Sequence, residues 1–229
     1  MKILFFLFFS AIFAIDQSWD EKLLYSASFG GVDVATATLK SKKIKNIKNQ
    51  DILRIEFKAK SRPSLKYIFP INDKIIIDVD LNTWQPLKVE KKIREGSYKQ
   101  NSLSTFDHKN NIFIYKKDTI PYDGEIFNPY SLIYYFRTLD FSSDENYKIQ
   151  VVDNKKVTPL KFFTDKKVEV ETAFGKFYAN KVWPKKINGE PFKNAGKITI
   201  WISDKDKLPI IINLKMKFGS LNLELEKVN

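Results

Sequence analysis

The sequence predicts a mainly β protein: a strongly curved antiparallel sheet or partial barrel with one or two short helices. Apolar and polar residues alternate over most of the chain, and alternation with a period of two indicates half-buried strands. The alternating runs are short, about a dozen in number, and separated by turn-forming residues, which is typical of curved sheets and barrels. Residues 128–138 are the clear exception and follow a helical pattern.

Alternation begins near the start of the chain, where Tyr25 and Phe29 share one face of a predicted strand. Gly30 and Gly31 then indicate a turn into a second strand. The same reasoning predicts further strands at residues 32–39, 52–57, 67–69, 74–79, 87–93, 111–115, 148–152, 167–171 and 175–182.

The C-terminal third has the clearest pattern. Ile200 and its apolar neighbours alternate with polar residues and Trp201, and residues 204–207 form a polar, turn-forming link. Apolar residues then occupy even positions up to Phe218 and odd positions from 221 onward. Because a shift of one residue moves side chains to the other face, Gly219 is interpreted as a β-bulge within one long strand, with a tight turn as the alternative.

The predicted helix begins at Asn128, a favourable N-cap residue, followed by Pro129 at the first helical position. Tyr135, Phe136 and their neighbours leave little polar surface, so this short helix should be buried. Arg137 is the one charge in the segment. We expect a structural ion pair, with Asp78 as its partner, and hold recognition of an anion by the guanidinium as the alternative.

Residues 1–14 resemble a cleavable secretory signal, with Lys2, a short apolar run and a small residue, Ala14, at the expected cleavage site. The apolar run is too short to span a bilayer as a helix. Residues 15–229 have the length of a single domain, and no later segment is apolar for long enough to cross a membrane. We therefore expect a periplasmic or secreted protein.

The formal net charge is +12, which attracts anionic partners. Export argues against nucleic acid, so anionic lipid headgroups or acidic envelope polymers are the better candidates. A compositional bias toward lysine is the alternative, because only four basic residues are arginine.

Metal and nucleophile chemistry has few candidate residues, and we predict neither a catalytic residue, nor a metal site, nor a cofactor. The chain has no cysteine and one histidine, His108, in a polar stretch that is interpreted as a surface turn. Residues 78–82 resemble a calcium loop but lack its turn glycine and final glutamate, so Asx turns are the better interpretation. Asp204 and Asp206 could form a carboxylate pair, but a turn role is preferred.

Several segments resemble an exported bacterial family called domain of unknown function 3108. They are residues 21–25 with 30–35, the helix segment 128–137, residues 172–177 with Pro184, and the most specific stretch, 201–209 with 219–220. Asn128 and Ala35 depart from the residues expected there. The resemblance implies a periplasmic setting, no transferable activity, and a fold similar to the lipoprotein-carrier type, a curved sheet with a helix against its concave face.

Three functions remain open. The first is a non-enzymatic envelope protein that binds a lipid, an acylated protein or another amphipathic ligand. The second is an assembly module that binds another envelope protein through an exposed sheet edge. The third, a hydrolase based on carboxylates, is the least favoured. For the first function, the candidate ligand-binding residues are the inward-facing aromatics and their neighbours: Tyr25, Phe29, Tyr135, Phe136, Arg137, Trp201 and Phe218.

Overall fold

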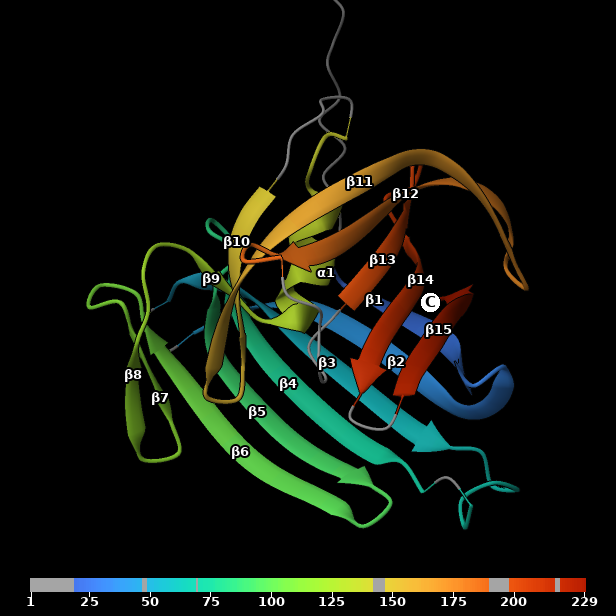
Figure 1. Cartoon of the computed structure of the whole chain (residues 1–229), viewed down its shortest axis with the longest axis horizontal. Coiled ribbons are helices and arrows are strands. Elements are labelled where there is room, and N and C mark those ends of the chain that lie inside the picture. The colour runs from blue at the N-terminus through green and yellow to red at the C-terminus, as the bar shows by residue number, and fades with distance from the viewer. Residues whose placement is uncertain (1–18, 47–48, 69, 142–146, 190–197, 217–218) are drawn as a thin grey trace, which may run out of the picture.

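The computed structural model describes residues 19–46, 49–68, 70–141, 147–189, 198–216 and 219–229. Within these ranges the chain forms fifteen strands and one helix, which confirms the mainly β class (Figure 1). The elements are β1 (Glu21–Phe29), β2 (Val32–Lys45), β3 (Asp51–Ser61), β4 (Asn72–Asp80), β5 (Pro86–Glu95), β6 (Tyr98–Asp107), β7 (Ile112–Tyr115), β8 (Asp118–Pro121), β9 (Ile126–Phe127), α1 (Pro129–Arg137), β10 (Tyr147–Asp153), β11 (Lys156–Thr172), β12 (Gly175–Lys186), β13 (Ile198–Ser203), β14 (Pro209–Met216) and β15 (Gly219–Val228).

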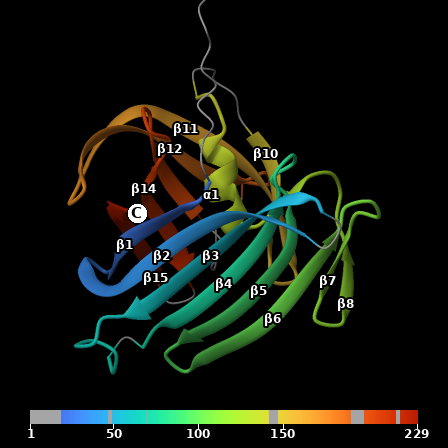
Figure 2. The same ribbon diagram turned by 180° about the vertical axis from the view of Figure 1, so that it is seen from behind.

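All fifteen strands belong to one sheet in the order β8-β7-β6-β5-β4-β3-β2-β1-β15-β14-β13-β12-β11-β10-β9. Neighbours are antiparallel except β9 and β10, which are parallel. The first and last strands, β1 and β15, pair in the middle of the sheet, so two meanders join along them. The sheet curves strongly around α1, as the two opposite views show (Figures 1 and 2).

The helix begins and ends as its sequence predicts. The Asn128 side chain accepts a hydrogen bond from the Tyr130 backbone N–H, and the Ser131 hydroxyl accepts one from the Asn128 N–H, a complete capping box. Thr138 caps the C-terminus. The helix lies against the concave side of the sheet, near β3, β4, β10 and β13, and its side chains belong to the main apolar core.

Two local expectations are wrong. Tyr67 and Ile68 lie in a turn and are largely exposed, so the predicted strand at 67–69 does not form in its described part, and residue 69 lies outside the described residues. Gly219 does not interrupt one long strand, because Met216 and Gly219 pair across a hairpin that joins β14 to β15. The alternative, a tight turn, therefore accounts for the change in apolar parity.

Strand number and length also exceed the prediction. Sequence patterning missed β6, β8 and β9, and it predicted only the last part of β11. The inward-facing side chains of β6 include Gln100, Ser102 and Ser104, so an apolar face is not visible in its sequence. These polar residues face the part of the interior described next.

Candidate functional site

Helix α1 packs its side chains into the core on the concave face of the sheet. Leu132 and Phe136 are completely buried, and Ile133 is 1% exposed. The Phe136 ring lies 4.9 Å from that of Phe162 on β11, and Tyr135 lies 4.8 Å from Phe127. Around these side chains, the described part of the concave face is therefore packed core.

The candidate ligand-binding residues that the structure describes lie in several different parts of the fold. Tyr25 is fully buried, and its hydroxyl donates a hydrogen bond to the Pro209 carbonyl at 2.9 Å. Phe29 is half-buried at the far end of β1, beside Gly219. Trp201 lies on the outer face, because its neighbours Ile200 and Ile202 point inward. Phe218 lies outside the described residues.

Arg137 forms a buried ion pair, but with Glu21 instead of Asp78. Its Nη1 and Nη2 atoms both bind the Glu21 carboxylate, the second at 3.0 Å, and its Nε donates to the Lys207 carbonyl at 2.8 Å. The expected partner, Asp78, points to the other face of the sheet, where it binds Arg54 through two hydrogen bonds. Arg137 thus links the helix to β1 and to the turn before β14, as the structural interpretation requires.

Aromatic rings enclose the Arg137 guanidinium. Its central carbon lies 5.1 Å from the ring centroids of both Trp19 and Tyr134, within the range of cation–π attraction. Burial raises the pKa of the Tyr134 and Tyr25 hydroxyls, so both stay protonated. With its charge paired and its ring faces covered, the guanidinium is positioned for stability, and no open anion site results.

A pair of carboxyl groups lies on the inner wall at the ends of β4 and β5. Asp73 is 7% exposed and accepts a hydrogen bond from the Arg94 backbone N–H at 2.7 Å. Burial raises the pKa of Asp73, and burial together with the charge of Asp73 raises the pKa of Glu95 to about 7. The two groups therefore share a proton in the neutral range, which is a coupled titration.

The two halves of the curved sheet meet along a seam held by side chains. Three successive residues of the β10–β11 turn reach across it: Asp153 pairs with Lys91 on β5, Asn154 with Gln100 on β6, and Lys155 with Asp118 on β8. A second apolar cluster supports the same seam: Phe113, Tyr115, Tyr122, Ile126 and Val152.

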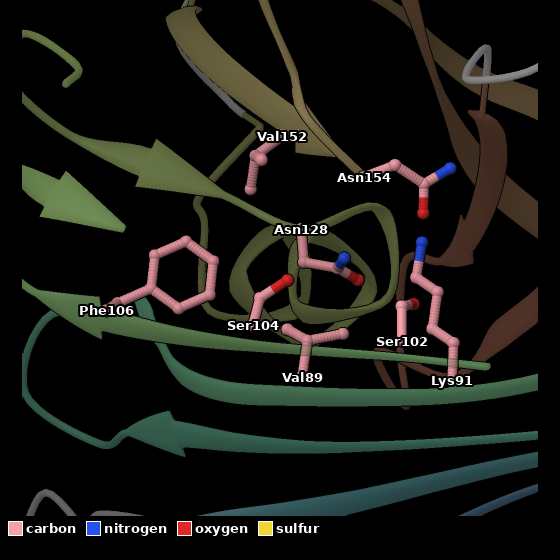
Figure 3. A pocket seen from close by; sticks show the side chains of 8 residues that line it. All are labelled: Val89, Lys91, Ser102, Ser104, Phe106, Asn128, Val152 and Asn154. Carbon is pink, nitrogen blue, oxygen red and sulfur yellow. The ribbon is translucent and has the colours of Figure 1, made fainter. Parts of the chain in front are cut away.

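A polar hollow remains at this seam (Figure 3). It is lined by Val89, Lys91, Ser102, Ser104, Phe106, Asn128, Val152 and Asn154. The Lys91 ammonium reaches toward Asn154, and Asn128 comes from the N-terminus of α1. The cavity volume of the hollow is about 10 Å³, far below the roughly 300–1,000 Å³ of ligand pockets. It has room for water but not for an acyl chain.

His108 is half-buried, where the sequence suggested a solvated turn. One ring nitrogen, Nδ1, lies 2.7 Å from the Tyr122 hydroxyl, and the other, Nε2, lies 2.9 Å from the Pro86 carbonyl. Because a carbonyl only accepts, Nε2 carries the hydrogen that it donates to Pro86, and Nδ1 shares a hydrogen bond with the Tyr122 hydroxyl. Both nitrogens are occupied, so His108 has no nitrogen free to activate a nucleophile.

The other acidic motifs have structural roles. Asp80 Oδ1 accepts hydrogen bonds from the backbone N–H groups of Asn82 and Thr83, as the Asx-turn interpretation predicts. Asp204 Oδ1 accepts one from the Asn180 side chain. Within the part of the chain that the structure describes, no group of three or more His, Cys, Asp or Glu residues could hold a metal ion. Nor is any helix there long and apolar enough to cross a membrane.

The outer face of β10–β12 carries basic and aromatic side chains together. Lys148, Lys161 and Lys185 occupy cross-strand positions next to one another, and we call them the lysine row. Beside the row, Phe163 and Trp183 stack with ring centroids 4.9 Å apart. Sequence reasoning did not select the lysine row. Alternation would have placed each residue outward, but only the strand register places them opposite one another.

Comparison with known proteins adds the fold and the family. A crystal structure described as a beta-barrel-like protein of domain of unknown function DUF1849 from Brucella abortus is similar, with a TM-score of 0.56. The match covers 91% of this chain and 96% of that one at 9% identity, so it supports the fold alone. No curated protein matches. The family model described as protein of unknown function (DUF3108) matches residues 24–226, and the chain therefore belongs to that family.

Proposed function

We propose that this protein is a non-enzymatic envelope protein that binds an anionic, amphipathic partner, a lipid surface, with its outer face. The observation that carries the proposal is the packing of α1: among the described residues its side chains are buried in the core of the concave face, which favours the outer face as the surface for a large partner. The absence of a free catalytic nitrogen on His108 is consistent with a binding role.

An exported location is part of this proposal and rests on the signal-like residues 1–14. Trp19 is 7% exposed and packs on Arg137, and cleavage after Ala14 would leave that contact intact. Intact-mass analysis of protein recovered from its native host tests this. A mature chain that starts within a few residues of Ile15 is expected, and retention of Met1 would contradict export with cleavage.

Electrostatics support a lipid surface as the partner, because the formal charge of +12 attracts anionic headgroups. The test is flotation with vesicles of equimolar phosphatidylcholine and phosphatidylglycerol, compared with vesicles of phosphatidylcholine alone. We expect binding to the anionic vesicles only, and a loss of binding as salt shortens the Debye length to about 3 Å at 1 M. Equal binding to both vesicles, or to neither, would contradict the proposal.

The packing of α1 against the sheet disfavours a second form of lipid binding, in which a single acyl chain lies inside the curved sheet. An acyl chain there would have to displace side chains such as Leu132 and Phe136, both completely buried. Titration with a fluorescent fatty acid distinguishes the two forms. We expect no saturable binding by the wild-type protein, whereas stoichiometric binding would show that α1 moves aside and that the interior is the site.

A sheet edge supports a second candidate, an assembly module. Strand β8 ends the sheet order, and Asp118, Thr119 and Pro121 on it are exposed. An extended peptide could add to this edge by backbone hydrogen bonds. Replacement of Thr119 by Pro would remove one backbone donor from the strand, so it should abolish such pairing in a pull-down with a defined partner while leaving vesicle binding unchanged.

A further inference from the structure

The lysine row is a line of like charges set by the strand register. Lys148 lies directly opposite Lys161, and Lys161 lies directly opposite Lys185, across β10, β11 and β12. The flanking residues Ile149 and Phe162 are buried, so alternation places the three lysines on the outer face. Lys148 and Lys185 are exposed and Lys161 is half-buried. Like charges at directly opposite positions destabilise a sheet, so the arrangement calls for a compensating partner.

That partner is not supplied by the described part of the chain. Among the described residues, no carboxylate comes within 4.0 Å of any of the three ammonium groups. Other lysines of the sheet are paired: Lys181, also on β12, binds Asp165 at 3.3 Å. Within the part of the chain that the structure describes, the three charges of the row therefore have no carboxylate partner.

Aromatic rings hold two of these ammonium groups in place. The Lys161 ammonium lies 5.1 Å from the centroid of Phe163, and the Lys185 ammonium lies 5.1 Å from Phe163 and 5.0 Å from Trp183. These distances are within the range of cation–π attraction. The stacked pair of rings lies beneath the charges and restricts the two lysine side chains. These side chains therefore lose less conformational entropy when they bind an anion.

We infer that the lysine row is the surface that receives the anionic headgroups of a lipid bilayer, an inference that rests on the proposed function. Neighbouring strands lie about 4.8 Å apart, so the row extends over roughly 10 Å, close to one Debye length in physiological salt. The three charges therefore act together on a membrane surface. Half-buried Trp183 beneath them is the type of amphipathic aromatic residue that favours the headgroup region, and Phe163 stacks on its ring.

Single-stranded nucleic acid is the competing polyanion, and the aromatic geometry disfavours it. Proteins that bind single strands stack the bases on open aromatic faces. Here the ammonium groups of Lys161 and Lys185 cover the faces of Phe163 and Trp183. A partner therefore meets ammonium groups that lie over the aromatic rings, and this surface suits headgroup phosphates better than nucleic acid bases.

The test is a triple variant, Lys148→Gln with Lys161→Gln and Lys185→Gln, titrated with vesicles of equimolar phosphatidylcholine and phosphatidylglycerol. Each lysine near an anionic membrane increases the binding affinity about fivefold, so the triple variant should bind roughly 100-fold more weakly. The matched control replaces three lysines that line another hollow. Lys88 and Lys92 lie on β5, and Lys116 lies in the turn after β7. The control loses the same net charge and should stay within about threefold of wild type, because distant charges are screened.

A triple Lys→Arg variant at the row keeps the charge and should retain binding, which separates loss of charge from loss of fold. Circular dichroism and the denaturation midpoint verify folding of every variant. If wild type fails to bind anionic vesicles, the proposed function is wrong. If wild type binds and both Gln variants bind alike, the proposed function stands and the lysine row is not the surface. Row-dependent binding of a single-stranded oligonucleotide without row-dependent vesicle binding would also overturn the inference.

Discussion

Replacing Arg137 by Met should destabilise the protein strongly, because it leaves buried groups without partners. The Arg137 side chain is 2% exposed and that of Glu21 is 10% exposed. The change removes two charge-assisted hydrogen bonds to Glu21 and the bond to the Lys207 carbonyl. Removing one partner of a buried ion pair costs about 3–5 kcal/mol of unfolding free energy, a large share of a typical total of about 5–15 kcal/mol.

The companion variant Glu21→Gln and the double variant complete a thermodynamic cycle. Each single change leaves one charge buried and unpaired, whereas the double change removes both charges. The double variant should therefore be less destabilised than the sum of the two single variants, by about 1–3 kcal/mol, as is typical of directly contacting residues. Urea unfolding followed by tryptophan fluorescence measures all four free energies, and Trp19, which packs on Arg137, reports on this region.

Arg54→Met is the matched control for the Arg137 variant. Arg54 also forms two hydrogen bonds with a carboxylate, that of Asp78, at 2.7 and 2.8 Å. Its side chain is 47% exposed, so water compensates for most of the loss, and the cost should be about 1 kcal/mol or less. If Arg137→Met costs no more than Arg54→Met, the reasoning from burial is wrong.

Three further predictions follow from backbone strain, a coupled titration and like charges. Gly219→Val should lower the unfolding free energy by about 2–4 kcal/mol, because φ is +147° and an added Cβ would collide with the Phe29 ring. Wild-type stability should fall by about 1–2 kcal/mol, after allowance for solvent screening, as pH rises from about 4.5 to about 7. Glu95, beside Asp73, keeps its proton up to about pH 7 only when folded, and Glu95→Gln should remove this slope. Lys148→Gln should raise the unfolding free energy by about 0.2–1 kcal/mol at low salt, because it removes one like-charge contact from the lysine row.

Each of these predictions has its own control. Gly30→Ala places a Cβ in open space at φ +58°, a milder conformation than the +147° of Gly219. Gly219→Ala should therefore cost more, and equal costs would show that neither its φ nor the Phe29 ring penalises a side chain there. Glu90→Gln, on the outer side of β5, should keep the wild-type pH slope, and loss of the slope there would contradict the assignment to Glu95. The Lys148→Gln gain should vanish in high salt, and a gain that persists would not be electrostatic.

The strands and the helix could be predicted where a short stretch of sequence contains a complete local pattern, such as alternation or a helix cap. The alternation around Ile200 and the cap at Asn128 are local, and both features form as predicted. Strand β6 could not be found this way, because its inner face carries Gln100 and other polar side chains that are satisfied only across the seam. On that face, three polar residues separate Tyr98 from Phe106, so the hydrophobic period is too weak to detect.

Partners distant in sequence could not be predicted from pattern. Asp78 was the reasonable choice for Arg137, since it is an acid at a strand end, yet one position of strand parity sends it to the opposite face, where it meets Arg54. The sequence around Glu21 does not indicate that it pairs with Arg137, because its approach to the helix depends on the pairing of β1 with β15.

Register also links the two parts of the surface argument. The turn between β10 and β11 fixes which residues of these strands stand opposite each other, since Asp153 pairs with Lys156 and the pairing continues to Lys148 and Lys161. The same turn carries the side chains that close the seam toward β5, β6 and β8. A slip of one residue would break the seam and turn Lys148 or Lys161 toward the core. The contacts that join the two halves of the curved sheet therefore also hold the lysine row on the outer face, so a stable interior and a charged exterior are consequences of one hairpin.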